Sequence, residues 1–286
     1  MAKWEGTFGG LDAEFWARKP LIGMVHLPPL PGSPRDTGML LEAMLAQAVA
    51  DARALEAGGA DAVMVENFFD APFAKDAVPP HTIAAMTRAV QVVREAISLP
   101  TGVNVLRNDA RSALAIAHIC GAQFIRVNIY VGAAVTDQGI IEGAAREVVL
   151  YRRQLRADVA IWADVFVKHA AQLGAFTLED AAKDAVLRGL ADALIVSGAA
   201  TGSATEVEDV RRVKAAVPAV PVLVGSGFRA ETAPTLLAHA DGAIVGTSLK
   251  RNGQVAEPVD VERVRALRAA MDVFLSGAKT ATTKAE

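Results

Sequence analysis

The apolar positions of this chain follow two different spacings. Short runs rich in Val, Ile and Ala recur along its length, and between them lie stretches with an apolar residue every three or four positions. The short runs predict buried parallel strands, and the stretches between them predict amphipathic helices. The predicted strands are residues 20–27, 62–65, 101–105, 124–128, 159–164 and 193–197, followed by two short ones centred on Leu223 and Ile244. Eight strands are therefore expected.

The segments between the strands complete a regular alternation of strand and helix. The predicted helices are residues 39–55, a stretch ending near 96, a stretch after 109, and then 142–156, 177 onward, 205–216, 230–238 and 261–274. Eight such units in one chain are typical of a single (β/α)8 TIM barrel. An open doubly wound sheet is the alternative, but no G-x-G-x-x-G follows the first strand, and for the same reason no dinucleotide cofactor is expected.

Composition and charge narrow the class of protein further. The 286 residues carry a formal net charge of −3, so the chain has no general excess of positive charge with which to bind nucleic acid. The single cysteine, Cys120, lies in an apolar stretch and predicts a buried, reduced thiol in a cytoplasmic protein. No apolar stretch reaches the length of a transmembrane segment. The predicted parts are an N-terminal extension, the barrel and a disordered tail, at residues 1–19, 20–275 and 276–286.

The N-terminal extension is unusually rich in aromatic side chains. It carries Trp4, Phe8, Phe15 and Trp16. Because eight strands are already assigned, these side chains either plug the bottom of the barrel or meet a second copy of the chain. The sequence leaves both open, and a homo-oligomer is one of the two expectations.

The last two predicted strands end on glycine and hydroxyl residues, which predict an anion site. In TIM barrels a phosphate is commonly held by the loops after the seventh and eighth strands, where backbone N–H groups converge. Glycine lets the backbone approach the phosphate oxygens, and Ser and Thr add hydroxyl donors. The predicted phosphate-binding residues, with two from the end of the sixth strand at the rim, are Ser197, Gly198, Gly225, Ser226, Gly227, Gly246, Thr247 and Ser248.

Other polar side chains fall at the C-terminal ends of the predicted strands and should meet at the barrel mouth, where TIM-barrel chemistry takes place. The predicted catalytic residues are Glu66, Asn104, Asp164, Lys168 and His169. The predicted substrate-binding residues are His26, Arg107, Asn108, Arg126 and Asn128. Each could instead belong to the polar mouth that any TIM barrel needs.

The residues at the end of the fifth strand are compatible with several kinds of chemistry. Strand alternation cannot aim Asp164, Lys168 and His169 all inward, so the chain must bend after Asp164 if His169 joins the site. The sequence indicates no cofactor outright, but Asp164 and Glu66 could hold a divalent cation with His26 or His169, or one carboxylate could act as a general base. Lys168 could bind an oxyanion or form a Schiff base. A structural Asp164–Lys168 ion pair is the alternative.

Several motifs together resemble those of the BtpA/SgcQ family. They are the proline-rich segment 20–34, residues 102–108, 136–139 and 164–169, Ser197 and Gly198 with Thr201 and Gly202, and residues 225–227. The resemblance covers residues from about 20 to 274. It implies a fold similar to the ribulose-phosphate-binding barrels. The family label refers to photosystem I biogenesis, and members also occur with sugar-uptake genes.

Two classes of function follow from these observations. The first is an enzyme acting on a small phosphorylated sugar or nucleoside-type metabolite by lyase, isomerase or hydrolase chemistry. The second is a non-catalytic assembly or regulatory factor that uses the barrel as a scaffold. A scaffold does not need Glu66, Asn104, Asp164, Lys168 and His169 at one mouth, so the enzyme is favoured.

Overall fold

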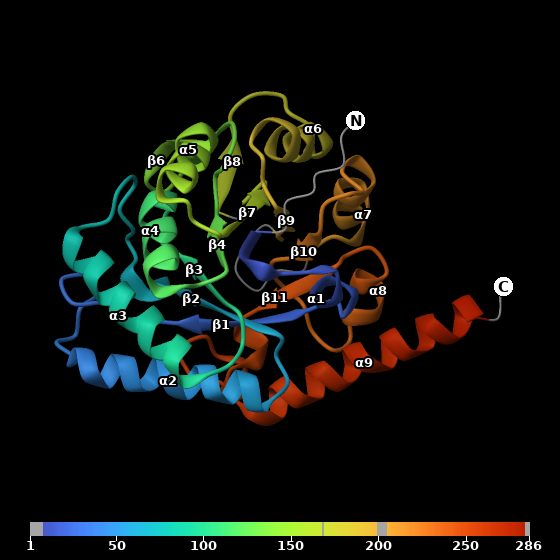
Figure 1. The fold of residues 1–286 in the computed structure, drawn as a ribbon, viewed down its shortest axis with the longest axis horizontal. Helices are drawn as coiled ribbons and strands as arrows, with labels where there is room; N and C mark the ends of the chain where they lie inside the picture. Colours follow the sequence, from blue (N-terminus) through green and yellow to red (C-terminus); the bar gives the residue numbers. More distant parts are fainter. Residues whose placement is uncertain (1–7, 168, 199–204, 284–286) are drawn as a thin grey trace.

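Eight parallel strands close into a barrel at the centre of the molecule (Figure 1). The computed structural model describes residues 8–167, 169–198 and 205–283. Around the barrel the strands follow the order β1-β11-β10-β9-β7-β4-β3-β2. Their bounds are β1 Leu21–His26, β2 Ala62–Glu66, β3 Thr101–Asn104, β4 Phe124–Val127, β7 Ala160–Val165, β9 Ala193–Val196, β10 Val222–Val224 and β11 Gly242–Val245. The predicted (β/α)8 barrel is confirmed.

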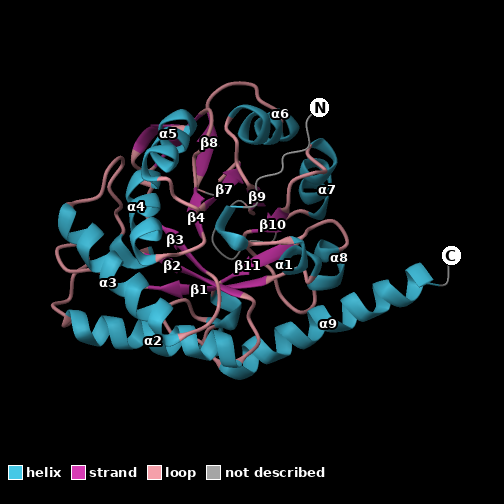
Figure 2. Cartoon of the chain, in the orientation of Figure 1, coloured by secondary structure: helices cyan, strands magenta, loops and turns pink. Residues whose placement is uncertain are grey.

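Helices form the outer layer (Figure 2). They are α2 Leu41–Ala57, α3 Pro80–Ala96, α4 Ala110–Cys120, α5 Ala145–Leu155, α6 Leu178–Lys183, α7 Val207–Ala216, α8 Ala233–Leu237 and α9 Val261–Thr283. The outward side chains of the strands and the inner faces of these helices share one large apolar core. The sequence placed the start of a disordered tail at residue 276, whereas α9 continues to Thr283. None of the described helices has the length and apolar character that a membrane crossing requires.

The lower half of the barrel interior is a second apolar cluster, built from inward-facing strand residues. The rings of Phe124 and Trp162 stack there with centroids 3.7 Å apart. Gly102 on β3 leaves the space that the Phe124 ring occupies, because a Cβ at this position would lie 1.9 Å from the ring. The lower interior is thus filled with side chains, and a ligand can enter only from the C-terminal end.

The N-terminal extension closes the bottom of the barrel. It forms a 3-10 turn (Phe8–Gly10) and the short helix α1 (Ala13–Ala17), and Phe8, Phe15 and Trp16 pack against the lower interior cluster. The Trp16 and Trp162 rings lie 5.6 Å apart. These contacts support the plugging alternative for three of the four aromatic residues, and Trp4 lies outside the described residues.

Replacing Trp16 by alanine separates plugging from self-association. Because Trp16 is half-buried against Trp162, we expect the free energy of unfolding to fall by about 2 kcal/mol. If the extension only plugs the barrel, light scattering gives the same molar mass for the variant and the parent protein. A lower mass with little change in stability would instead show that Trp16 forms a contact between copies.

A small antiparallel sheet lies beside the barrel mouth, and the sequence did not predict it. It consists of β5 (Ala133–Thr136), β6 (Gly139–Glu142) and β8 (Ala170–Gln172), with β5 in the middle. The sequence predicts no strand between residues 128 and 142, and it predicts a fifth strand at residues 159–164 with a bend after Asp164 if His169 is to join the mouth. The strand ends at Val165, and Phe166 adopts a left-handed φ of 55°. The chain then leaves the barrel and pairs with β5.

Candidate functional site

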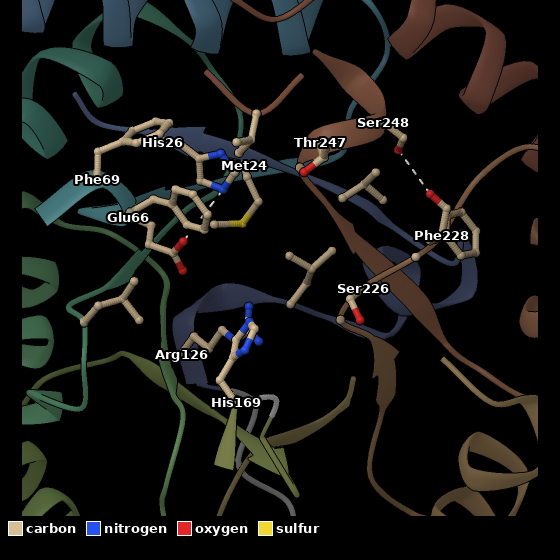
Figure 3. A pocket seen from close by; sticks show the side chains of 18 of the residues that line it. Met24, His26, Glu66, Phe69, Arg126, His169, Ser226, Phe228, Thr247 and Ser248 are labelled. Carbon is tan, nitrogen blue, oxygen red and sulfur yellow. Dashed lines mark hydrogen bonds and ion pairs between the residues drawn. The ribbon is translucent and has the colours of Figure 1, made fainter. Parts of the chain in front are cut away.

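A cavity of about 670 Å³ opens at the C-terminal mouth of the barrel (Figure 3). Its wall comes from the ends of β1, β2, β4, β10 and β11 and from the loops that follow the strands. Its volume lies in the range of small-molecule sites, about 300 to 1,000 Å³. Of the predicted site residues, the cavity is lined by His26, Glu66, Arg107, Arg126, Asn128, His169, Gly225, Ser226, Gly227, Gly246, Thr247 and Ser248.

Two glycines shape the β10–β11 side of the cavity. A Cβ at Gly225 would lie 2.4 Å from Ser197 Oγ, and a Cβ at Gly246 would lie 2.9 Å from His26 Cε1. Neither position can therefore carry a side chain without displacing its neighbours. The backbone of both loops borders the cavity there, with the Ser226 and Thr247 side chains beside it (Figure 3). We call the segments 225–227 and 246–248 the glycine cup.

Ser197 and Gly198 do not line the cavity but contact residues of the glycine cup. The Gly198 N–H donates a hydrogen bond to Ser226 Oγ at 2.8 Å. Thr205 Oγ1 donates to the Ser226 carbonyl at 2.9 Å. Residues 199–204, which include the motif residues Thr201 and Gly202, lie outside the described part of the chain.

Three arginines at the cavity were missed by the sequence interpretation. Arg35, Arg229 and Arg263 line the cavity, and all three are exposed. Arg263 also donates to the Ser248 carbonyl at 3.3 Å. The sequence could have indicated Arg229 as a cavity residue, because Arg229 directly follows the 225–228 loop. Arg263 lies in the first turn of the last helix, and helices that follow barrel strands begin on the side of the C-terminal face, so this position was a usable signal as well.

Strand register gathers His26, Glu66 and Asn104 on the β1–β3 side. His26 is the register partner of Glu66, and Glu66 is the partner of Asn104 on the next strand. Asn104 Nδ2 donates to Glu66 Oε1 at 2.6 Å, and His26 Nε2 lies 3.7 Å from Glu66 Oε2. All three residues are at least nine-tenths buried. Glu66 and His26 line the cavity, and the hydrogen bond from Asn104 orients the Glu66 carboxylate.

Asp164 is held by two residues from β4 and the loop after it. Its carboxylate accepts hydrogen bonds from Arg126 Nε and Nη2 at 3.0 and 2.9 Å and from Asn128 Nδ2 at 2.7 Å. The Asp164 side chain is inaccessible and does not line the cavity, whereas Arg126 and Asn128 do. Burial by itself lowers the pKa of Arg126, but the charge of Asp164 and its hydrogen bonds outweigh that effect and raise it. Arg126 therefore stays protonated at the cavity floor.

Arg107 and Asn108 follow β3 but differ in their surroundings. Arg107 lines the cavity, and burial lowers its pKa although Asp164, Asp137 and Glu66 partly offset the effect. Asn108 is not part of the cavity wall. Its side chain donates to the Ile129 carbonyl at 2.9 Å and accepts from the Ile129 N–H at 2.8 Å, which joins the loops after β3 and β4.

His169 reaches the cavity because of the turn after β7. Its own φ is 56°, and β8 begins at the next residue, where Ala170 pairs with Thr136 of β5. His169 lies on the side of the mouth opposite His26 (Figure 3), consistent with the positions of β7 and β1 across the barrel. The bend that the sequence required for His169 to join the mouth is present. Lys168 lies outside the described residues.

The metal site considered from the sequence is not formed by the described residues. Glu66 is engaged with His26 and Asn104, whereas Asp164 is turned toward Arg126 and Asn128. Within residues 8–167, 169–198 and 205–283, no three His, Cys, Asp or Glu side chains are grouped so that they could hold a metal ion. The carboxylates of Glu66 and Asp164 thus have different hydrogen-bond and ion-pair partners.

The sequence as a whole matches a known family. The model of the BtpA family matches residues 17–273. The chain belongs to the BtpA family. The Photosystem I biogenesis protein BtpA of Synechocystis sp. is 50% identical over 257 residues, which cover 90% of this chain and 89% of that protein. An uncharacterized protein of Thermococcus kodakarensis is 50% identical over 87% of this chain and 94% of its own length.

Solved structures with the same fold are distant in sequence from this BtpA family member. A putative orotidine-monophosphate decarboxylase from Toxoplasma gondii matches with a TM-score of 0.57 at 16% identity, covering 96% of this chain and 97% of that one. Thiamine phosphate pyrophosphorylase from Pyrococcus furiosus matches with a TM-score of 0.55 at 16% identity, covering 91% and 98%. At these identities the similarity establishes the TIM-barrel fold alone.

Proposed function

We propose that this BtpA family member is an enzyme that acts on a small phosphorylated sugar or nucleoside-type metabolite. The observation that carries the proposal is the position of Glu66, whose carboxylate lines the cavity and is oriented by Asn104. A buried carboxylate at a cavity wall, beside a histidine, is suited to moving a proton. The reaction class that this arrangement supports is isomerisation or lyase-type cleavage started by proton abstraction, with hydrolysis as a further possibility for the same groups.

The glycine cup is the proposed site for the phosphate. Backbone N–H groups and the hydroxyls of Ser226 and Thr247 would donate to the phosphate oxygens, and Arg229 and Arg263 would balance the charge. The fold analogy supports this assignment, because the distant structural relatives include proteins named for phosphorylated compounds. It remains an analogy of fold, so the residues of the cup carry the argument.

The order of the strands gives the remaining groups their places around a bound metabolite. The cup follows β10 and β11, which stand across the barrel from β3 and β4. A ligand anchored in the cup therefore extends toward Arg107, Arg126 and Asn128 on the far side. Glu66 with His26 would face its middle from one flank and His169 from the other. We propose Glu66 as the base, His169 as the acid, and Asp164 as a residue that acts by orienting Arg126 and Asn128.

Arginine substitutions test the cup with inorganic phosphate alone. We expect the Arg229→Gln/Arg263→Gln double variant to bind phosphate roughly five- to thirtyfold more weakly in calorimetric titrations, since each exposed charge contributes up to about 1 kcal/mol. The matched control is Arg251→Gln/Arg265→Gln, which removes two positive charges at positions outside the cavity wall, one from the segment after β11 and one from α9. Equal losses of phosphate affinity in both double variants would show that the arginines act through general electrostatic attraction and not at a specific site.

A thermal-shift screen against phosphosugars and nucleotides tests the function itself. Compounds that bind are then incubated with the protein, and products are followed by mass spectrometry. We expect at least one phosphorylated compound to raise the melting temperature and to be converted. Failure of every phosphorylated compound to bind would overturn the proposal.

The second candidate function is that of a non-catalytic assembly factor. It is favoured by the 50% identity with a protein named for photosystem I biogenesis. The two candidates differ in what they require of Glu66. An assembly role would survive the Glu66→Gln substitution, which leaves the outer surface unchanged, whereas an enzyme would lose its turnover.

A further inference from the structure

Three phenylalanines form one wall of the cavity, and we call them the Phe wall. Phe68, Phe69 and Phe73 come from the loop between β2 and α3, and all three line the cavity. Each is half-buried, and none belongs to the apolar core clusters of the described chain. Their place at the cavity, outside the core, leaves the rings free to form part of the cavity wall.

The rings of the Phe wall are arranged by contacts among themselves and with His26. Phe68 stacks on the His26 ring with centroids 4.5 Å apart and an interplanar angle of 30°. Phe69 meets Phe68 edge to face at 5.1 Å, and Figure 3 shows the Phe69 ring at the cavity beside His26. Aromatic faces held in this way form a flat apolar surface. A planar ring can stack on this surface, whereas the hydroxyls of a sugar interact with it only weakly.

The Phe wall and the glycine cup are close neighbours around the barrel. The wall follows β2, the cup follows β11 and β10, and β1 lies between β2 and β11. His26 and Met24 of β1 line the cavity between them. One molecule can therefore place its phosphate in the cup and a ring on the wall, with the connecting part above Glu66. The cavity, at about 670 Å³, is larger than a lone sugar phosphate requires.

We propose that the Phe wall binds a planar unsaturated ring, so that the substrate is a phosphate ester carrying such a ring, of the nucleoside monophosphate class, rather than a simple sugar phosphate. This inference rests on the proposed function and names its substrate class. The end of the wall lies beside Arg107, whose backbone N–H donates to the carbonyl of Ala74, the residue after Phe73, at 3.3 Å. A guanidinium only donates hydrogen bonds, so Arg107 is suited to acceptor atoms on the ring edge.

Calorimetric titration with matched compounds tests the inference. The probes are inorganic phosphate, ribose 5-phosphate, uridine 5′-monophosphate and adenosine 5′-monophosphate. We expect at least one of the two nucleotides to bind about tenfold or more tightly than ribose 5-phosphate, which is the gain typical of one base stacked on aromatic side chains. Phe69→Leu and Phe73→Leu keep the apolar bulk but remove the aromatic face. Each should reduce the nucleotide advantage while leaving the affinity for ribose 5-phosphate within about twofold.

The control variant is Phe176→Leu, which changes an exposed phenylalanine remote from the cavity wall and should alter none of the affinities. Equal affinity of the parent protein for ribose 5-phosphate and both nucleotides would overturn the inference and leave the proposed function standing. A nucleotide advantage that persists in both wall variants would overturn the assignment to the Phe wall. If neither ribose 5-phosphate nor a nucleotide binds, this inference fails, and the proposed function fails with it when no compound of the thermal-shift screen binds either.

Discussion

Replacing Glu66 by glutamine is expected to lower kcat by about a hundred- to ten-thousandfold, the range typical of removing a general base. The amide has nearly the same shape as the carboxylate and can still accept the hydrogen bond from Asn104, but it cannot take up a proton. The measurement is the steady-state rate with a compound that the thermal-shift screen identifies. Phosphate affinity should stay within about threefold, because Glu66 follows β2 on the flank of the cavity and is not part of the glycine cup.

The matched control for Glu66→Gln is Glu42→Gln. Glu42 lies in the first turn of α2, its side chain is 76% exposed, and it takes no part in the cavity. Its substitution should leave both kcat and the melting temperature unchanged. A kcat near the parent value in Glu66→Gln would remove Glu66 from the chemistry and would favour the assembly-factor alternative.

Replacing Asp164 by leucine is expected to lower the free energy of unfolding by about 3–5 kcal/mol, because it leaves the Arg126 guanidinium buried without its counter-charge. The Arg126 and Asp164 side chains are 4% and 0% exposed, and two hydrogen bonds join them. The Arg126→Met/Asp164→Leu double variant removes both charges and should recover much of the loss. Urea denaturation of the single and double variants measures the coupling.

An exposed ion pair provides the control for this cycle. Arg211 and Glu208 on α7 form a pair whose side chains are 54% and 61% exposed. Arg211→Met should therefore lower the free energy of unfolding far less than Asp164→Leu does. A loss in Asp164→Leu as small as that in Arg211→Met would contradict the assignment of Asp164 as the residue that holds Arg126. A folded double variant with very low turnover would show that the chemistry needs the Arg126 charge.

The strands were predictable because each depends on local apolar runs. Parallel barrel strands are buried on both faces, so they appear in the sequence as short aliphatic runs that end on polar or glycine residues. The glycines of the cup were found in the same way, since Gly225 and Gly246 each follow such a run. The start of α6 is local in the same way: the sequence predicts a helix from residue 177, and the Asp180 N–H donates to Thr177 Oγ1 at 3.1 Å. Each signal spans only a few residues.

The pairing of side chains across the mouth was not predictable from the sequence. Asp164 was considered as a partner of Lys168 or of a metal ion. Among the residues that the structure describes, which do not include Lys168, its hydrogen bonds come from Arg126 and Asn128, on β4 and just after it. His26, Glu66 and Asn104 were each placed at the mouth, but only the register of β1, β2 and β3 sets them side by side. Register depends on how all the strands close into a barrel.

The sequence by itself determined the barrel, the family and the end of the barrel at which the polar residues gather, because strand period and motif spacing are properties of neighbouring residues. The tertiary structure alone decided the small sheet of β5, β6 and β8 that carries His169 to the mouth, and the place of Arg35 at the cavity wall. These contacts join residues far apart in the chain. They exist only once the strands have closed and the helices have packed around them.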